Sequence, residues 1–400
     1  MKKYLFVISV VAVLFFMTAC DTSFMYNSDG SLEQIKQKTT MQSFEQLNEP
    51  IVISMPVYED YYLFGNKNFD SRQKRAGDMI VVIDIETNTV YDWVFFSGEH
   101  GWAIWRLVEA GSNPTRYLMS CPGTGEVATV DPRNIELTVT YTGFYENFWC
   151  WKVNGTKAPM CYGSYNTELH CSNYHTQLFD CETNTLSETD ICVPTLSVGF
   201  ITTLRSDYEG NSWISYQHPD NTTHVQKINK NTEIMESSIA TFEKYPDSYA
   251  IECISDEYVF IGYQTYDDNF TGLIIINLKN GEKIEVSGIK ESSVIQYVYD
   301  IQKVNNDYYA IVPTCIGSNL PRSINIYKID LENKSAFKEI SIPFDMTENV
   351  YVRGSRIYFM RSRNLCNITY TYYDTETGEV GEVVPVKQSK IIEDYLKTIK

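Results

Sequence analysis

Short apolar runs alternate with polar turns along almost the whole chain. The hairpin that begins at Met79, MIVVIDIETNTVYDW, consists of an apolar run, an Asp, a polar turn and a second apolar run. Six later stretches repeat this plan: VATVDPRNIELTV, TQLFDCETNTLSE, VQKINKNTEIMES, LIIINLKNGEKIEV, NIYKIDLENKSAFKEI and YTYYDTETGEVGEV. Apolar runs of this length between turn residues are typical of β-strands, so the pattern predicts an all-β chain.

The hairpins follow one another at a nearly constant spacing. The first residues of their turns are Asp84, Asp131, Asp180, Asn229, Asn277, Asp330 and Asp374, at intervals of 47, 49, 49, 48, 53 and 44 residues. A period of roughly 40–50 residues made of short strands is typical of a four-stranded propeller blade. We therefore expect one domain, residues 50–386, folded as a seven-bladed β-propeller with strands a to d in each blade. The alternative is eight blades, the extra one being assembled from the N-terminal and C-terminal segments.

Blade 1 and the two flanking segments carry further predictions. In blade 1 the runs IVISMPV and YYLFG are expected to form strands a and b, and the Met79 hairpin strands c and d. In the tether, residues 21–49, the stretch Ser31 to Gln34 has the spacing of a capping box and predicts one short helix. In residues 387–400 apolar positions recur every three or four residues, which predicts a C-terminal helix.

The N-terminus has the layout of an export signal. Lys2 and Lys3 precede an apolar run that is shorter than a membrane span, and Thr18-Ala19-Cys20 follows. The ending MTAC resembles a bacterial lipoprotein box. This resemblance implies that residues 1–20 are a signal peptide and that Cys20 becomes the first mature residue, carrying acyl chains such as palmitate; the alternative is an ordinary cleaved signal with Cys20 incidental. We expect an extracytoplasmic, membrane-anchored lipoprotein, since two or more acyl chains anchor a protein stably.

Composition and charge limit the classes of partner that the protein can bind. Hydrophobic residues make up 43% of the chain and charged residues 21%, which supports a packed core. The formal net charge is −18. Such a surface repels phosphate backbones and anionic headgroups, so we expect no nucleic-acid partner and a membrane attachment that depends on lipid.

Three of the hairpins resemble a known repeat. VVIDIETNTV at Val81 to Val90, and less closely QLFDCETNTL and YYDTETGEV, resemble the repeat units of YVTN-type and quinoprotein-like β-propellers. The resemblance extends over the whole repeat region and implies the propeller fold. Quinoproteins also place a tryptophan at a fixed offset after the turn glycine, but here Trp93 is one residue late and Glu382 occupies that place in the last repeat. We therefore expect no cofactor.

Catalytic and metal-binding motifs are scarce. The chain has no GxSxG, HExxH, Walker or EF-hand pattern, so no catalytic residue is predicted. Five of its ten cysteines fall in the third repeat: Cys150, Cys161, Cys171, Cys181 and Cys192. They lack CxxC or HxxxH spacing, which favours buried thiols or one disulfide over a metal site. Cys150 and Cys161 flank the turn at Asn154-Gly155 and are the best candidate pair.

The sharpest functional hypothesis concerns loop positions. Loops joining strand b to c, and strand d to the next a, share the face of a propeller that usually carries function. These loops hold a set that we call the basic sector: Arg72, Lys74 and Arg75 in blade 1, Arg322 in blade 6, and Arg361 and Arg363 in blade 7. Other loops of this face offer aromatic side chains, namely His100, Trp102, Tyr145, Trp149, Tyr216, His218, Tyr263 and Tyr266.

Ring closure makes blades 6, 7 and 1 neighbours, so the basic sector predicts an anion-binding patch. The corresponding function is a binding or scaffold module for an anionic glycan or an acidic protein segment. Two alternatives remain open. The charges are simply solvated loop side chains, or the protein is an enzyme that acts on an extracellular carbohydrate or peptide at the central face.

Overall fold

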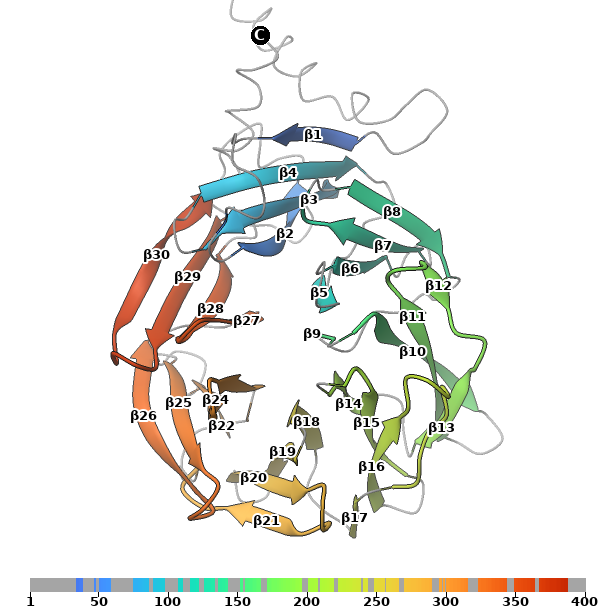
Figure 1. The fold of residues 1–400 in the computed structure, drawn as a ribbon, viewed down its shortest axis with the longest axis vertical. Coiled ribbons are helices and arrows are strands. Elements are labelled where there is room, and N and C mark those ends of the chain that lie inside the picture. Colours follow the sequence, from blue (N-terminus) through green and yellow to red (C-terminus); the bar gives the residue numbers. More distant parts are fainter. Residues whose placement is uncertain are drawn as a thin grey trace, which may run out of the picture.

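The computed structural model is a ring of seven β-sheets (Figure 1). It describes residues 34–38, 47, 50–58, 75–85, 89–97, 107–110, 116–121, 126–133, 136–142, 152–153, 155–166, 171–195, 201–207, 209–218, 222–238, 240–243, 248–255, 257–265, 270–289, 295–296, 298, 300–315, 323–343, 349–363 and 367–387. All elements in these residues are strands, and the prediction of a seven-bladed propeller is confirmed. No described segment is a helix long and apolar enough to cross a membrane.

The first four blades contain strands β1 to β17. Blade 1 consists of β1 (Gln34–Lys38), β2 (Pro50–Tyr58), β3 (Arg75–Asp84) and β4 (Thr89–Ser97). Blade 2 consists of β5 (Leu107–Ala110), β6 (Arg116–Cys121), β7 (Glu126–Asp131) and β8 (Glu136–Tyr141), with β9 (Lys152–Val153) added to its sheet. Blade 3 consists of β10 (Lys157–Asn166), β11 (Cys171–Asp180), β12 (Thr185–Leu186) and β13 (Ile191–Thr195). Blade 4 consists of β14 (Ile201–Ser206), β15 (Ser212–Gln217), β16 (Thr222–Ile228) and β17 (Ala240–Glu243).

The last three blades contain strands β18 to β30. Blade 5 consists of β18 (Ser248–Ile254), β19 (Tyr258–Thr265), β20 (Phe270–Asn277) and β21 (Lys283–Val286). Blade 6 consists of β22 (Ile295–Gln296), β23 (Asp300–Val304), β24 (Asp307–Cys315), β25 (Ser323–Asp330) and β26 (Ser335–Pro343). Blade 7 consists of β27 (Asn349–Arg353), β28 (Arg356–Arg363), β29 (Asn367–Asp374) and β30 (Val380–Lys387). Neighbouring strands are antiparallel, apart from β9, which pairs parallel with β5 of blade 2.

Side-chain hydrogen bonds and residues with positive φ close the hairpins between strands c and d. Asp374 Oδ1 accepts hydrogen bonds from the backbone N–H groups of Glu376 (3.0 Å) and Thr377 (3.2 Å), and Gly378 has φ 72°. Asp180 does the same for Glu182 and Thr183, and Asn184 takes the left-handed φ of 55°. A short polar side chain followed by a residue that tolerates positive φ therefore closes these turns.

Two predictions for the N-terminal part are wrong. The expected helix near Ser31 is not formed at Gln34–Lys38, because these residues pair as β1 with Asp92–Phe96 of β4. The strand order in blade 1 is also shifted. Pro50 lies opposite Asp84, just as Arg356 of strand b in blade 7 lies opposite Asp374. Hence β2 is strand b, β3 and β4 are strands c and d, and β1 is added outside strand d. The run YYLFG and the predicted C-terminal helix lie outside the described residues.

Apolar side chains on facing blades form the described core. Between blades 5 and 6, Phe260, Leu273 and Ile275 pack with Tyr308 and Val312, and all are buried. Similar clusters join blades 2 and 3, 3 and 4, 4 and 5, and 6 and 7. Both faces of most blades are therefore buried, which explains the continuous apolar runs in the sequence.

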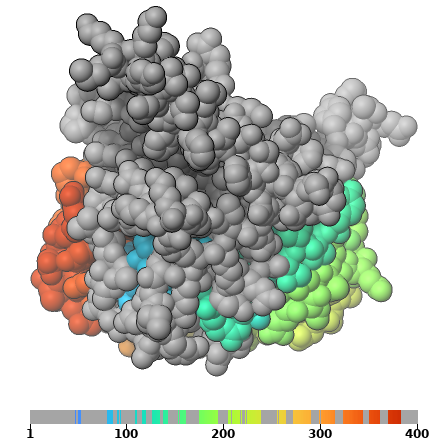
Figure 2. Space-filling view, turned by 90° about the horizontal axis from the view of Figure 1, so that it is seen from above, coloured from blue at the N-terminus to red at the C-terminus, as the bar shows by residue number. Residues whose placement is uncertain are grey.

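The ring closes where blade 7 meets blade 1. Each of these two sheets is built from its own end of the chain, and no described strand of one enters the other. Figure 2 views this region from above, with blade 7 in red on one side of the blue atoms of blade 1 and blades 2 and 3 in green on the other. In the part of the chain that the structure describes, the two ends of the ring meet through contacts between sheets.

Candidate functional site

The basic sector is only partly described. Arg75 is the first residue of β3 and lies opposite Tyr58, and Arg363 ends β28 opposite Asn367. Both positions lie at the edge where strand b connects to strand c, which we call the b–c edge. Arg361 is two residues before Arg363 on β28. The backbones of these three arginines thus share one edge in two adjoining blades.

Other predicted residues lie outside the described part of the chain. These are Arg72, Lys74, Arg322, His100, Trp102, Tyr145, Trp149, Tyr266, Cys20 and Cys150, while only the backbones of Arg75, Arg361, Arg363 and Cys161 are described. Cys161 lies on β10 opposite Thr176. The anion patch, the lipidation site and the Cys150–Cys161 pair therefore stay predictions.

An aromatic cluster lies at the b–c edge of blade 4. The rings of Tyr216 and His224 stack with centroids 5.4 Å apart, and His218 lies 5.2 Å from His224. His224 Nε2 is 2.8 Å from the hydroxyl of Thr222, and the Tyr216 hydroxyl donates to Gln226 Oε1 at 2.5 Å. Two residues predicted for this face, Tyr216 and His218, therefore pack together. Tyr263 instead donates to Glu285 (3.0 Å).

A buried ion pair links three blades beside the ring closure. Arg353, the last residue of β27, lies 3.4 Å from Glu109 Oε2 of β5 and donates to the carbonyl of Pro50 at 3.4 Å. The Arg353 and Glu109 side chains are only 16% and 17% exposed. Burial lowers the pKa of Arg353, but the Glu109 carboxylate together with Tyr117 and Tyr351 outweighs this effect, and the pKa is raised. This group thus connects strands of blades 7, 1 and 2.

Strand a of blade 6 carries another buried charge. Asp300 accepts hydrogen bonds from the backbone N–H of Ile301 (2.8 Å) and from Gln302 Nε2 (2.6 Å). Burial raises the pKa of Asp300 to about 6, although the Arg205 charge, from strand a of blade 4, and these hydrogen bonds lower it. Innermost strands of the propeller therefore contribute ionisable groups that the sequence analysis did not single out.

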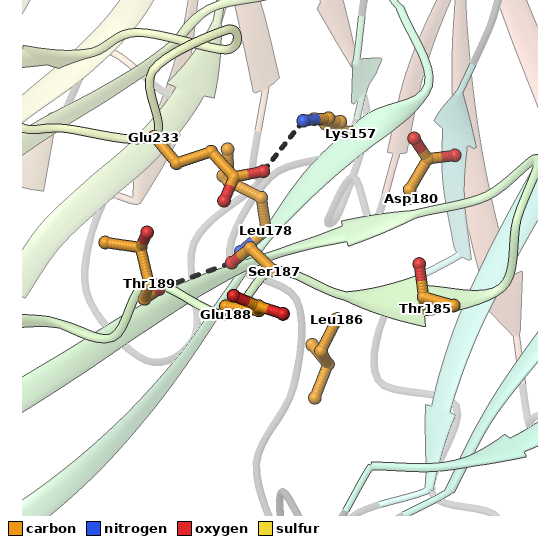
Figure 3. A pocket seen from close by; sticks show the side chains of 9 residues that line it. All are labelled: Lys157, Leu178, Asp180, Thr185, Leu186, Ser187, Glu188, Thr189 and Glu233. Atoms are coloured by element: carbon orange, nitrogen blue, oxygen red, sulfur yellow. Dashed lines mark hydrogen bonds and ion pairs between the residues drawn. The ribbon is translucent and has the colours of Figure 1, made fainter.

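A pocket of about 340 Å³ lies at the opposite edge, between the c–d hairpins of blades 3 and 4. Figure 3 shows Lys157 of β10 pointing toward Glu233, with Nζ 2.7 Å from Oε1. Asp180 and Glu188 supply two further carboxylates, and Leu178 and Leu186 are the apolar lining. The pocket is open and its lysine is already paired. It lies away from both the b–c edge and the central face.

The described residues contain no group of three or more His, Cys, Asp and Glu side chains suited to a metal ion. The site residues that the sequence analysis missed are Glu109, Arg353 and Asp300. Each is a charged residue within or at the end of a short apolar strand, as in NVYVR. This pattern was a usable signal, because a charge in a buried strand needs a partner.

Comparisons with solved structures show the fold alone. A prolyl endopeptidase is 8% identical with a TM-score of 0.51, and the match covers 85% of this chain and 50% of that one. Hydrazine synthase of Kuenenia stuttgartiensis is 14% identical, with a TM-score of 0.47 and coverage of 68% and 76%. TolB of Acinetobacter baumannii is 10% identical, with a TM-score of 0.41 and coverage of 85% and 80%. The sequence matches no protein-family model and no curated protein.

Proposed function

We propose that the protein is a membrane-anchored, extracytoplasmic binding module whose basic sector holds an anionic ligand. The ligand class is a carboxylated or phosphorylated glycan or an acidic protein segment. The observation that supports this best is the shared b–c edge of Arg75, Arg361 and Arg363 in blades 1 and 7. These residues are nearly 290 positions apart in the sequence, and only ring closure brings their strands to neighbouring blades.

Arginine suits this role because its planar guanidinium holds a carboxylate or phosphate through two parallel hydrogen bonds. The rest of the protein is acidic, with a formal net charge of −18. General repulsion of anions leaves the basic sector as the favoured place for binding, which provides selectivity as well as attraction.

The enzyme alternative is less well supported. It requires ionisable groups that converge on the central face. Of the described groups on innermost strands, Glu109 is paired with Arg353, and Asp300 is held by hydrogen bonds from Ile301 and Gln302. The His175–Asp190 pair lies on the outer part of blade 3, and the pocket of Figure 3 lies at the c–d edge. We therefore favour binding over catalysis.

Ligand binding is tested with the full-length chain in detergent and two polyanions, polygalacturonate and poly-glutamate. Arg361→Ala combined with Arg363→Ala is expected to weaken binding by about tenfold or more, since even one lost charge-assisted contact contributes about 1.5–3 kcal/mol. Lys279→Ala combined with Lys283→Ala removes the same charge at the c–d edge and is the matched control. Equal losses in both double variants would show a non-specific charge effect and reject the site.

Anchorage is tested separately. Cys20→Ser is expected to abolish incorporation of labelled palmitate and to release the protein from the membrane fraction. Unchanged labelling in this variant would reject Cys20 as the acylated residue, without bearing on the anion site.

A further inference from the structure

Blade 3 places a cysteine, a histidine and an aspartate on one face of its outer strands. Antiparallel pairing of β11 with β13 sets His175 directly opposite Cys192. Asp190 is two residues before Cys192, and its Oδ2 lies 2.9 Å from His175 Nδ1. Directly opposite residues of an antiparallel pair have Cβ atoms roughly 4.5–5.5 Å apart and side chains on the same face. The thiol and the imidazole are therefore neighbours by register.

Asp190 sets the orientation of the imidazole. An ionised carboxylate only accepts hydrogen bonds, so His175 Nδ1 carries the proton and Nε2 keeps its lone pair. This is the arrangement in which a histidine serves as base for an adjacent nucleophile, with a third group orienting the base. The side chains of His175 and Asp190 are 21% and 40% exposed, and Cys192 is exposed as well. Small reagents in solvent thus have access to the group.

The same blade contains a second thiol, Cys181, which is buried where Cys192 is exposed. Cys181 is buried, 2% exposed, and packs with Phe179 and Met160. Burial, with Asp180 and Glu182 nearby, raises the pKa of Cys181 to about 11. A buried thiol near carboxylates stays protonated and inert, whereas an exposed thiol beside a histidine forms the reactive thiolate more readily.

We infer that Cys192 is a reactive thiol that exchanges with low-molecular-weight disulfides, with His175 as its base and Asp190 as the residue that positions His175. This site is independent of the proposed anion-binding function. It lies on blade 3, outside the basic sector, and involves none of the arginines.

The exchange balances without any further oxidant. His175 Nε2 takes the proton from Cys192 Sγ, and the thiolate attacks one sulfur of the disulfide. The new sulfur–sulfur bond forms as the old one breaks, and the released thiolate takes the proton back from His175. The products are a mixed disulfide on Cys192 and one free small thiol, so the oxidation of the Cys192 sulfur is balanced by the reduction of the released sulfur.

The experiment exposes the full-length protein to oxidised glutathione and locates the adduct by peptide mass spectrometry over time. At pH 7, glutathione is expected on Cys192 and not on Cys181. His175→Gln is expected to slow the reaction at Cys192 about tenfold, because less of the thiol is ionised. At pH 9.5, where an ordinary thiol ionises unaided, the parent and His175→Gln rates are expected to converge.

Asp190→Asn is the second variant, since Asp190 is partly exposed and its replacement leaves the strand pairing intact. It is expected to slow the reaction at pH 7 by a smaller factor than His175→Gln. Thermal unfolding of both variants serves as the control for folding. The inference is overturned if Cys181 reacts as fast as Cys192, or if neither variant changes the Cys192 rate at pH 7.

Discussion

Two junctions of the propeller differ in the contacts that the described residues make. Blades 5 and 6 are consecutive in the chain, and apolar side chains such as Phe260 and Tyr308, with ring centroids 4.7 Å apart, fill the space between them. Blade 7 meets blades 1 and 2 from the other end of the chain. There, Arg353 reaches the carbonyl of Pro50, 303 positions away, and the carboxylate of Glu109.

The difference has a physical reason. Consecutive blades stay close because a short connection joins them, so non-directional apolar contact is enough to pack them. The first and last blades have no such connection, and the directional contacts of Arg353, a hydrogen bond to blade 1 and an ion pair to blade 2, orient blade 7 at the closure. We treat this role in specificity as a hypothesis, since buried ion pairs contribute less to stability than apolar packing does.

The largest effect is expected at the apolar junction. Phe260→Ala removes a fully buried ring from the cluster between blades 5 and 6, and should lower the free energy of unfolding by about 3–5 kcal/mol. Denaturant unfolding measures this loss. Phe337→Ala, which removes an exposed ring of β26, is the control and should leave the midpoint nearly unchanged. A similar loss in both variants would contradict the packing described here.

A somewhat smaller effect is expected at the closure. Glu109→Ala leaves Arg353 buried without its carboxylate and should cost about 3 kcal/mol in the free energy of unfolding. Combining Glu109→Leu with Arg353→Met removes both charges and should cost less than Glu109→Ala alone. If the double variant is the less stable of the two, the pair contributes stability and not only orientation.

Asp300 is a buried carboxyl group in blade 6, one of the two blades that meet at the apolar junction. Its pKa is about 6 when folded, against 3.8 for an ordinary aspartate, so the folded state keeps the proton longer than the unfolded chain. Stability of the parent protein should therefore fall as pH rises from about 4 to about 6. Asp300→Asn should remove this fall and gain about 1–2 kcal/mol at pH 7, with no gain at pH 3.5. Thermal unfolding of both proteins between pH 3.5 and pH 7 measures this pH dependence. If stability falls with pH as steeply in Asp300→Asn as in the parent, the prediction is wrong.

The smallest effect distinguishes two tyrosines of blade 7. The Tyr370 hydroxyl is buried without a hydrogen-bond partner, so Tyr370→Phe should raise the free energy of unfolding by about 1 kcal/mol. Tyr373 donates to Glu339 at 2.9 Å, and Tyr373→Phe should lower it by about the same amount. Changes of the same sign in the two variants would contradict the assignment of their hydrogen bonds.

The repeat was predictable because it is local. The turn at Asp374 needs only the residues within one hairpin, so its spacing was visible in the sequence. Blade 1 was predicted in the wrong phase because YYLFG has the composition of a strand. The segment QIKQK has no strand pattern, yet it pairs as β1 because β4 offers it an unpaired edge.

The partners of these buried charges were not predictable, because the pairing depends on how the ring closes. Arg353 and Glu109 are 244 positions apart, and nothing in either local sequence identifies the other. His175 and Cys192 are closer, but their pairing depends on the register of β11 with β13 and on the interruption of strand d into β12 and β13. The sequence showed the residue types, and the sheet register decided which of them meet.

Strand β1 also sets the length of the linker between the propeller and its proposed lipid anchor. From Cys20 to Gln34, where pairing with β4 begins, there are 34 − 20 = 14 residues. A fully extended chain covers at most about 3.3–3.6 Å per residue, so the rim of blade 1 stays within about 50 Å of the acylated cysteine. If Cys20 is anchored as proposed, this bound fixes how far the rim of blade 1 stands from the lipid surface, and only the propeller's own width extends its reach beyond it.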